Sequence, residues 1–258
     1  MHPILNVAIH AAKIAGKLII QYYNYDLFNK KTIQENKIII SKITKKAEKL
    51  ITKTIYKFYP QHVILNNQNK KIKKKIYWVI NPINGIHNFI KNFPYFVISI
   101  SVHINNNTEV AVIYEPICNE MFTCIRGRGA QLNGYRLRIG TTRNIHAESI
   151  AISFFIKEKK TFFKYINLVQ KLFLQKNIKI FRSIGSTILE LAYVAAGRID
   201  GFLQTNLNCM NTAGAILLIQ EAGGLIIDFW GTNNYVKSRN IIAGNPYIVK
   251  FILHSINT

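Results

Sequence analysis

The stretch WVINPINGIHNF, residues 78–89, has the form of a buried strand that runs into a tight turn. Its apolar opening favours a strand, and Pro82 and Gly85 are turn formers. A turn at the carboxyl end of a strand is a common place for metal-binding carboxylates. The two positions that could carry them here are Asn81 and Asn84. The stretch therefore resembles a metal-binding turn in which the expected carboxylates are replaced by neutral amides.

The chain has 258 residues, of which 49% are hydrophobic, enough for one large domain or two small ones that share a core. No apolar run approaches the roughly 18 to 20 residues of a membrane span, and residues 1–20 read as an amphipathic helix rather than a secretory signal. The cysteines, Cys118, Cys124 and Cys209, form no CxxC pair. We therefore expect no disulfide, no zinc site and no membrane partner, and a reducing cytoplasm as the location.

The charge balance is strongly positive, with 34 Lys and Arg against 12 Asp and Glu, a net charge of +22. One interpretation is attraction to nucleic acid or another polyanion. The other is compositional, because an AT-rich genome overproduces Lys, Asn and Ile codons. Under both interpretations the protein should adhere to RNA or DNA at low salt.

In the first half of the chain, the pattern predicts a helix near the N-terminus and a short strand at Ile38–Ile40. A second helix should follow with Ser41 as its N-cap. A strand at 63–66 and a lysine-rich loop at 70–75 precede a meander of strands through about residue 125, which predicts an antiparallel sheet with helices on one side. The Gly-rich segment 126–134 fits hairpin turns rather than a dinucleotide-binding loop, because no helix start follows it.

The second half reads as alternating strands and helices. Strands are expected at 149–155, 178–182, 199–205, 225–230 and 240–245, with helices at about 160–175, 186–197 and 211–224. No low-complexity linker and no repeat separates the halves. We expect an α+β subdomain over 1–145 and an α/β subdomain over 146–258, abutting as one compact unit. The first contains the turn within residues 78–89, which we call the motif turn.

These pieces, in this order, resemble the inositol monophosphatase family, and within it the bacterial branch that serves as Nus factors. The carrying segments are residues 1–19, YPQH (59–62), 78–100, TEVAVIYEP (108–116), RGRGAQLNGYRLR (126–138), ELAYVAAGRIDGF (190–202) and IIAGNP (241–246). The resemblance implies a layered α-β-α-β-α sandwich, usually dimeric, with magnesium-dependent phosphomonoesterase activity.

The resemblance also places the family's site residues on this chain, and the carboxylates are missing. Its metal positions fall at Asn67, Asn81, Ile83, Asn84 and Asn211, and its catalytic positions at Asn67, Ile86 and His87. The substrate pocket would comprise Ile83, Asn84, Gly85, Ile86, Arg182, Gly185, Ser186, Thr187, Gln204 and Asn211. Because Mg²⁺ usually needs one or two carboxylates, we expect that the ion is not bound and that no catalytic set is intact. The structural roles survive, since Asn caps helices as well as Asp and Asn211 could still start its helix.

Three functions remain open. The first is a non-catalytic component of ribosomal RNA transcription antitermination, a chaperone of RNA folding and ribosome biogenesis. Its implied partners are NusA, RNA polymerase, the other Nus factors and nascent ribosomal RNA, and it would be a homodimer. The second is a working magnesium-dependent inositol-1-phosphate phosphatase. The third is a decaying protein kept as a homodimer or a loose polyanion binder. We favour the first, with the enzyme as the alternative.

Overall fold

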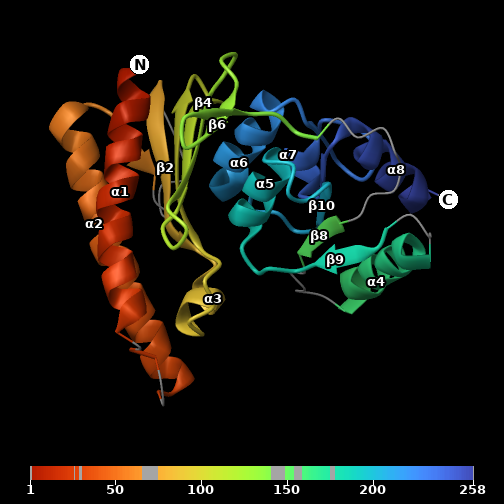
Figure 1. Cartoon of the computed structure of the whole chain (residues 1–258), viewed down its shortest axis with the longest axis horizontal. Helices are drawn as coiled ribbons and strands as arrows, with labels where there is room; N and C mark the ends of the chain where they lie inside the picture. The colour runs from red at the N-terminus through yellow and green to blue at the C-terminus, as the bar shows by residue number, and fades with distance from the viewer. Residues whose placement is uncertain are drawn as a thin grey trace.

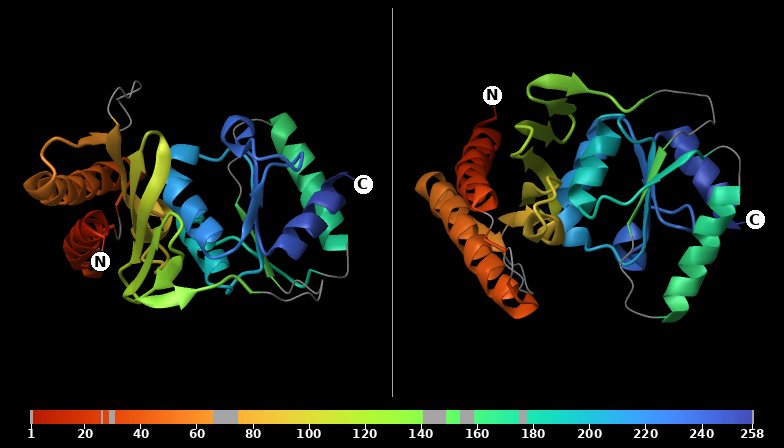
Figure 2. Two further views of the ribbon diagram at one scale, coloured as in Figure 1. Left: turned by 90° about the horizontal axis from the view of Figure 1, so that it is seen from above. Right: turned by 60° about the horizontal axis from the view of Figure 1, so that its bottom comes forward.

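A computed structural model describes residues 2–25, 27–28, 31–65, 75–140, 149–153, 159–174 and 178–257, and its helices and strands alternate in five layers (Figure 1). The outermost layer at the N-terminal side consists of α1 (Pro3–Asn24) and α2 (Ile33–Phe58). A sheet, a middle pair of helices, a second sheet and a last pair of helices follow, as Figure 2 shows from two other directions. The predicted α-β-α-β-α class is confirmed.

The first sheet has seven strands in sequence order. They pair antiparallel except for β1 and β2, which are parallel. Their bounds are β1 Val63–Leu65, β2 Ile76–Asn84, β3 Val97–Ile104, β4 Asn107–Glu115, β5 Glu120–Ile125, β6 Ala130–Leu132 and β7 Tyr135–Leu137, with the short helix α3 at Ile86–Ile90 after β2.

The second sheet has five strands in the order β11-β12-β10-β8-β9. Strands β8, β9 and β10 run parallel, while β12 is antiparallel to both of its neighbours. The strands are β8 Ser149–Ser153, β9 Ile180–Arg182, β10 Gly201–Gln204, β11 Leu225–Ile227 and β12 Ile241–Gly244; the helices are α4 Lys159–Leu174, α5 Thr187–Ala195, α6 Cys209–Glu221, α7 Tyr235–Ser238 and α8 Pro246–Asn257.

Both faces of the first sheet are covered, which corrects the expectation of helices on one side. On β3, Ile98 and Ile100 belong to the buried cluster formed with α1 and α2. Their neighbour Val97 points the other way, into the cluster formed with α5 and α6. Alternate residues of a strand face opposite sides of a sheet, so a strand with apolar residues at successive positions needs a helix layer on each side.

The N-cap of helix α2 lies nine residues earlier than the sequence pattern predicts. Its N-cap is Thr32, whose hydroxyl accepts the N–H of Glu35 at 3.3 Å while the Glu35 carboxylate accepts the Thr32 N–H at 2.7 Å. This capping box satisfies two otherwise unpaired donors. The strand predicted at Ile38–Ile40 and the N-cap predicted at Ser41 are therefore wrong, because tertiary burial of Ile40 on the helix outweighs the β preference of that run.

Helix α1 is, by length and composition, apolar enough to cross a membrane, and it is the only such helix among the described residues. Its buried face, which includes Ala8, Ala11 and Ala15, packs on β3 and β4 as part of the core. Gly16 permits this close approach, since a Cβ there would lie 2.5 Å from a ring carbon of Tyr114. The buried face of the helix is part of the core between the N-terminal helices and the first sheet.

The Gly-rich segment serves turn geometry, as predicted. The N–H groups of Gly127 and Gly129 donate to the two carboxylate oxygens of Glu221 on α6, at 2.8 and 2.7 Å. Asn133 and Gly134 both have positive φ and close the β6–β7 hairpin. The boundary expected near residue 145 and the lysine-rich loop at 70–75 both fall largely outside the described residues.

Candidate functional site

A β-bulge shapes the motif stretch. Strand β2 pairs with β3 regularly as far as Asn81, opposite Ser99, and then shifts register before Asn84 pairs with Val97. Pro82 lies within this irregularity, where its missing N–H costs no ladder bond. Bulges re-aim side chains, and this one turns the end of β2 towards the middle helix layer.

The bulge forms one wall of a cleft of about 510 Å³. The site positions that line it come from three parts of the chain: the end of β2 with α3, the start of α5, and the start of α6. They are Asn81, Ile83, Asn84, Gly85, Ile86, His87, Gly185, Thr187 and Asn211. The structure thus brings together most of the positions that the sequence singled out.

The amide of Asn84 is held in one orientation by the start of α5. Its Oδ1 accepts the backbone N–H of Ile188 at 3.1 Å and the hydroxyl of Ser186 at 2.9 Å. A backbone N–H can only donate, so the oxygen must face α5. The other polar atom of the Asn84 side chain is Nδ2, a hydrogen-bond donor that cannot ligate a cation.

The motif turn is tied to the loop before α5 by Asn88, which the sequence reasoning missed. Its Nδ2 donates to the carbonyls of Tyr95 at 2.8 Å and Ile184 at 2.7 Å. Gly185 packs closely on this side chain, since a Cβ there would lie 3.1 Å from the Asn88 Oδ1. Only its position inside the motif turn hinted at this role.

The remaining substrate-side positions lie behind or beside the cleft. Thr187 donates to the buried Gln204 at 3.1 Å, so Gln204 supports the cleft wall without lining it. Ser186 is buried and its hydroxyl is engaged by Asn84. Arg182 is an exposed residue of β9 and does not line the cleft. An anion could have bound at the start of α5, but one of the free N–H groups there donates to Asn84 instead.

Asn211 lies in the first turn of α6 rather than at its cap. The N-cap is Asn208, whose side chain accepts the Asn211 N–H at 3.4 Å. The expectation that Asn211 starts this helix is therefore wrong, because Asn208 is placed three residues earlier with the same capping chemistry. Asn67 lies outside the described residues.

The cleft residues do not fit a magnesium site. Mg²⁺ takes oxygen ligands in near-octahedral geometry and usually includes carboxylates. Among the described lining residues Glu48 is the one carboxylate, and no group of three or more His, Cys, Asp or Glu side chains comes together in the described ranges. With Asn84 turned away as described, the neutral amides offer the ion no charge compensation.

Glu48 and Thr44 are cleft residues that the sequence reasoning missed. They stand one helical turn apart on α2 and line the cleft opposite the motif turn. An (i, i+4) pair shares one helix face, and that spacing was the available signal. Which of the many α2 residues meets the cleft depends on how α2 packs on β2, which the sequence pattern does not specify.

Glu190 on α5 is a buried carboxyl behind the cleft. Its Oε1 accepts the Ile184 N–H at 2.6 Å, and its buried Oε2 has no hydrogen-bond partner among the described residues. Burial raises the pKa of Glu190 from 4.5 to about 7, against the lowering effect of hydrogen bonds from the Ile184 and Gly185 backbone. Through the bond to Ile184, the Glu190 side chain holds the loop that precedes α5.

This predicts a pH-dependent stability difference for Glu190→Gln. Between pH 4.5 and about 7 the folded chain keeps a proton that the unfolded chain releases, so the favourable contribution of Glu190 is complete below that window and is lost as pH rises through it. Gln keeps the acceptor oxygen and cannot ionise. From pH 4.5 to pH 8 the free energy of unfolding of the variant should gain about 3 kcal/mol relative to the unaltered chain.

Urea denaturation of both proteins at the two pH values measures this difference. Taking the difference removes the opposite trend from His103, whose pKa burial lowers to about 4 and whose contribution therefore grows as pH rises. A difference that stays constant with pH would show that Glu190 is ionised in the folded protein.

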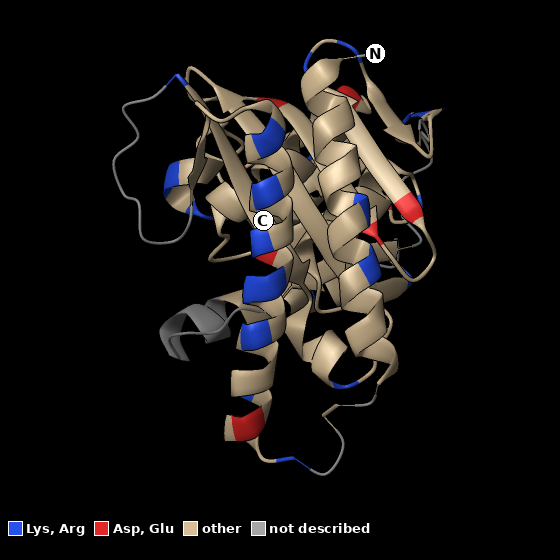
Figure 3. Cartoon of the chain, turned by 90° about the vertical axis from the view of Figure 1, so that its left-hand side faces the viewer, with Lys and Arg blue, Asp and Glu red and all other residues tan. Residues whose placement is uncertain are grey.

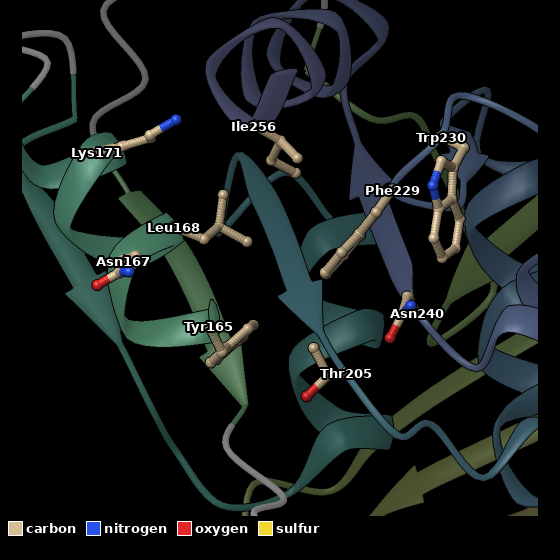
Figure 4. A pocket seen from close by; sticks show the side chains of 9 residues that line it. All are labelled: Tyr165, Asn167, Leu168, Lys171, Thr205, Phe229, Trp230, Asn240 and Ile256. Carbon is tan, nitrogen blue, oxygen red and sulfur yellow. The ribbon is translucent and has the colours of Figure 1, made fainter. Parts of the chain in front are cut away.

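A second cavity, of about 530 Å³, lies on the far side of the second sheet (Figure 4). Leu168 and Tyr165 of α4 stand on one side of it, and Phe229 and Trp230 after β11 on the other. Its lining is mostly apolar, and it shares no residue with the cleft at the motif turn. It holds none of the residues expected from the sequence.

Comparison with known proteins shows which family and which relatives this chain is similar to. The model of the inositol monophosphatase family matches residues 1–257. The chain is 44% identical to the Nus factor SuhB of Escherichia coli K12 over 256 residues, 98% of this chain and 95% of that one. It is 43% identical to the Nus factor SuhB of Buchnera aphidicola subsp. Schizaphis graminum over 231 residues, 89% of this chain and 85% of that one.

Solved structures of similar proteins have the same fold as this chain. The extragenic suppressor protein suhB from Bartonella henselae superposes with a TM-score of 0.86 at 29% identity, covering 100% of this chain and 99% of that one. The inositol monophosphatase from Anabaena (Nostoc) sp. PCC 7120 gives 0.82 at 25% identity, covering 98% and 95%. The chain belongs to the inositol monophosphatase family. That family is in general magnesium-dependent.

Proposed function

We propose that this protein acts as a Nus factor in the antitermination of ribosomal RNA transcription, as a scaffold rather than a phosphatase. Relatives at 44% and 43% identity over most of the chain carry the name Nus factor SuhB. The implied partners are NusA, RNA polymerase, the other Nus factors and nascent ribosomal RNA. The protein would work in the cytoplasm as a homodimer and support RNA folding and ribosome biogenesis.

The observation that carries the proposal is the orientation of Asn84. Its side-chain oxygen accepts hydrogen bonds from the start of α5, and its side-chain nitrogen is a donor. This arrangement supports a scaffold role for Asn84 rather than a role as a metal ligand. A protein that depends on its fold and not on catalysis can also accept Asn in place of a carboxylate at positions 81 and 211. We therefore propose that Mg²⁺ is not bound at this cleft.

The alternative is a magnesium-dependent inositol-1-phosphate phosphatase. The open cleft, with the exposed imidazole of His87 and the hydroxyl of Thr187 on its walls, is the feature that favours it. It would require a metal ion bound by Asn81, Asn84, Asn211 and Glu48. The charge of such a set is well short of what a dication needs.

We expect the purified chain to capture NusA and RNA polymerase from the same organism at about 0.15 M salt. Capture should be the same with EDTA or with magnesium, because no ion takes part. The variant His87→Ala, which changes an exposed cleft residue, should capture both partners equally well. Absence of capture, or magnesium-dependent release of phosphate from inositol 1-phosphate well above background, would contradict the proposal.

A further inference from the structure

The solvent face of α2 carries a line of lysines, shown in blue in Figure 3. All are exposed, and they recur at steps of one, three or four residues: Lys42, Lys45, Lys46, Lys49, Lys53 and Lys57. At about 100° per residue they fall within an arc of about 120°. We call this set the lysine stripe. It lies opposite the face that buries Ile43, Ala47 and Ile51.

The helix does not neutralise this charge itself. Glu35 caps the helix before the stripe begins, and Glu48 lies outside its arc, on the side that lines the cleft. Among the described residues, no carboxylate lies within ion-pair distance of a stripe lysine. Lys46 donates to the Tyr22 hydroxyl at 2.8 Å, which fixes its position without compensating its charge. Like charges at these spacings repel, so a bound polyanion should stabilise the helix.

The charge spacing matches a nucleic-acid strand. From Lys42 to Lys57 the stripe rises 15 residue steps, about 22 Å at 1.5 Å per step, so it carries about one charge per 4 Å. In one strand of a stacked double helix, phosphates recur about every 3.4 Å along the axis. One exposed aromatic ring, Tyr56, lies within the same arc and is 41% exposed. Rings of this kind stack on unpaired bases without regard to sequence.

We propose that the lysine stripe with Tyr56 binds a single strand of RNA through its phosphates. The proposal rests on the proposed function, since it names the surface at which the protein meets nascent RNA. Recognition would be independent of sequence, because lysines read phosphates and a stacking ring accepts any base.

The test measures binding of an unstructured single-stranded RNA of about 12 nucleotides, long enough to cover the stripe, by fluorescence anisotropy at several salt concentrations. With all six lysines engaged, the slope of log K against log salt should be about −4. The variant Lys42→Gln, Lys49→Gln, Lys53→Gln should reduce the slope to about −2 and weaken binding at least tenfold at low salt. Tyr56→Ala should weaken binding several-fold and leave the slope unchanged.

The matched control removes the same charge elsewhere. Lys171, Lys237 and Lys250 are exposed residues of α4, α7 and α8, far from α2 along the layers (Figure 1), and their change to Gln should leave the slope near −4. If both triple variants weaken binding equally, RNA binding follows net charge and the stripe is not the site.

Circular dichroism should show that each variant is folded. Each variant should still capture NusA, so a failed stripe with intact NusA capture leaves the proposed function standing.

Discussion

Replacing Asn81, Asn84 and Asn211 together by aspartate should create a magnesium site in the cleft. The three side chains line one cleft, and each carboxylate attracts a unit positive charge by about 4 kcal/mol at 4 Å in a dielectric of about 20. Mutual repulsion and dehydration of the ion offset much of this. We expect the affinity for Mg²⁺ to rise at least 100-fold, or about 3 kcal/mol, measured by titration calorimetry.

The altered protein should also show the repulsion directly. Without magnesium its melting temperature should fall, because three carboxylates face each other, and magnesium should restore it. The Asn84→Asp change keeps an oxygen for the Ile188 N–H, so the contact with α5 survives. The control variant Asn6→Asp, Asn107→Asp, Asn234→Asp adds the same charge at exposed positions outside the cleft. If the unaltered chain binds Mg²⁺ as tightly as the triple variant, neutral amides suffice and the scaffold proposal loses its basis.

Gly85→Ala should destabilise the protein by about 3 to 4 kcal/mol. Gly85 has φ +97°, and a Cβ there would lie 2.6 Å from the Tyr95 carbonyl oxygen and 3.1 Å from the Phe96 Cβ. The left-handed conformation alone costs an L-residue about 1 to 2 kcal/mol. The clash adds to this, because Tyr95 and Phe96 directly precede β3 and cannot shift without disturbing that strand.

Gly134 provides the control for this effect. It has a similar φ of +87°, but no atom of the described residues lies within 4 Å of its Cβ position, so Gly134→Ala should cost only the conformational part, about 1 to 2 kcal/mol. Urea denaturation of both variants gives the two free energies of unfolding. Equal costs would mean that the motif turn shifts freely, and that Gly85 is not what holds its shape.

Much of the fold could be predicted from residue patterns because its strands and helices follow local preferences. The motif stretch, the hairpin at Asn133–Gly134 and the helix closed by Gly197 all lie where turn and cap chemistry indicates. The start of α2 was missed because β-branched residues at 38–40 favour a strand in isolation, whereas burial of Ile40 and the Thr32 cap favour the helix. Local preferences of a few tenths of a kcal/mol yield to packing.

The candidate site was predictable in its positions and not in its contacts. Resemblance to the family named Asn81, Asn84 and Asn211, and the structure places all three in one cleft. Neither Glu48 on the opposite wall nor Asn88 as a tie to Ile184 was expected. Both residues make their contacts with another layer of the fold. Such contacts depend on how the helices pack on the sheet.

The amino-acid sequence by itself determined the charge of this protein and the neutrality of its motif turn, because ionisation is a property of side-chain type. It also determined the family, through the order of its segments. Only the tertiary structure decided which way the Asn84 amide points, since the N–H that orients it belongs to a residue 104 positions along the chain. Tertiary packing likewise decided that the lysine face of α2 points to solvent, because burial of the opposite face sets the rotation of the helix.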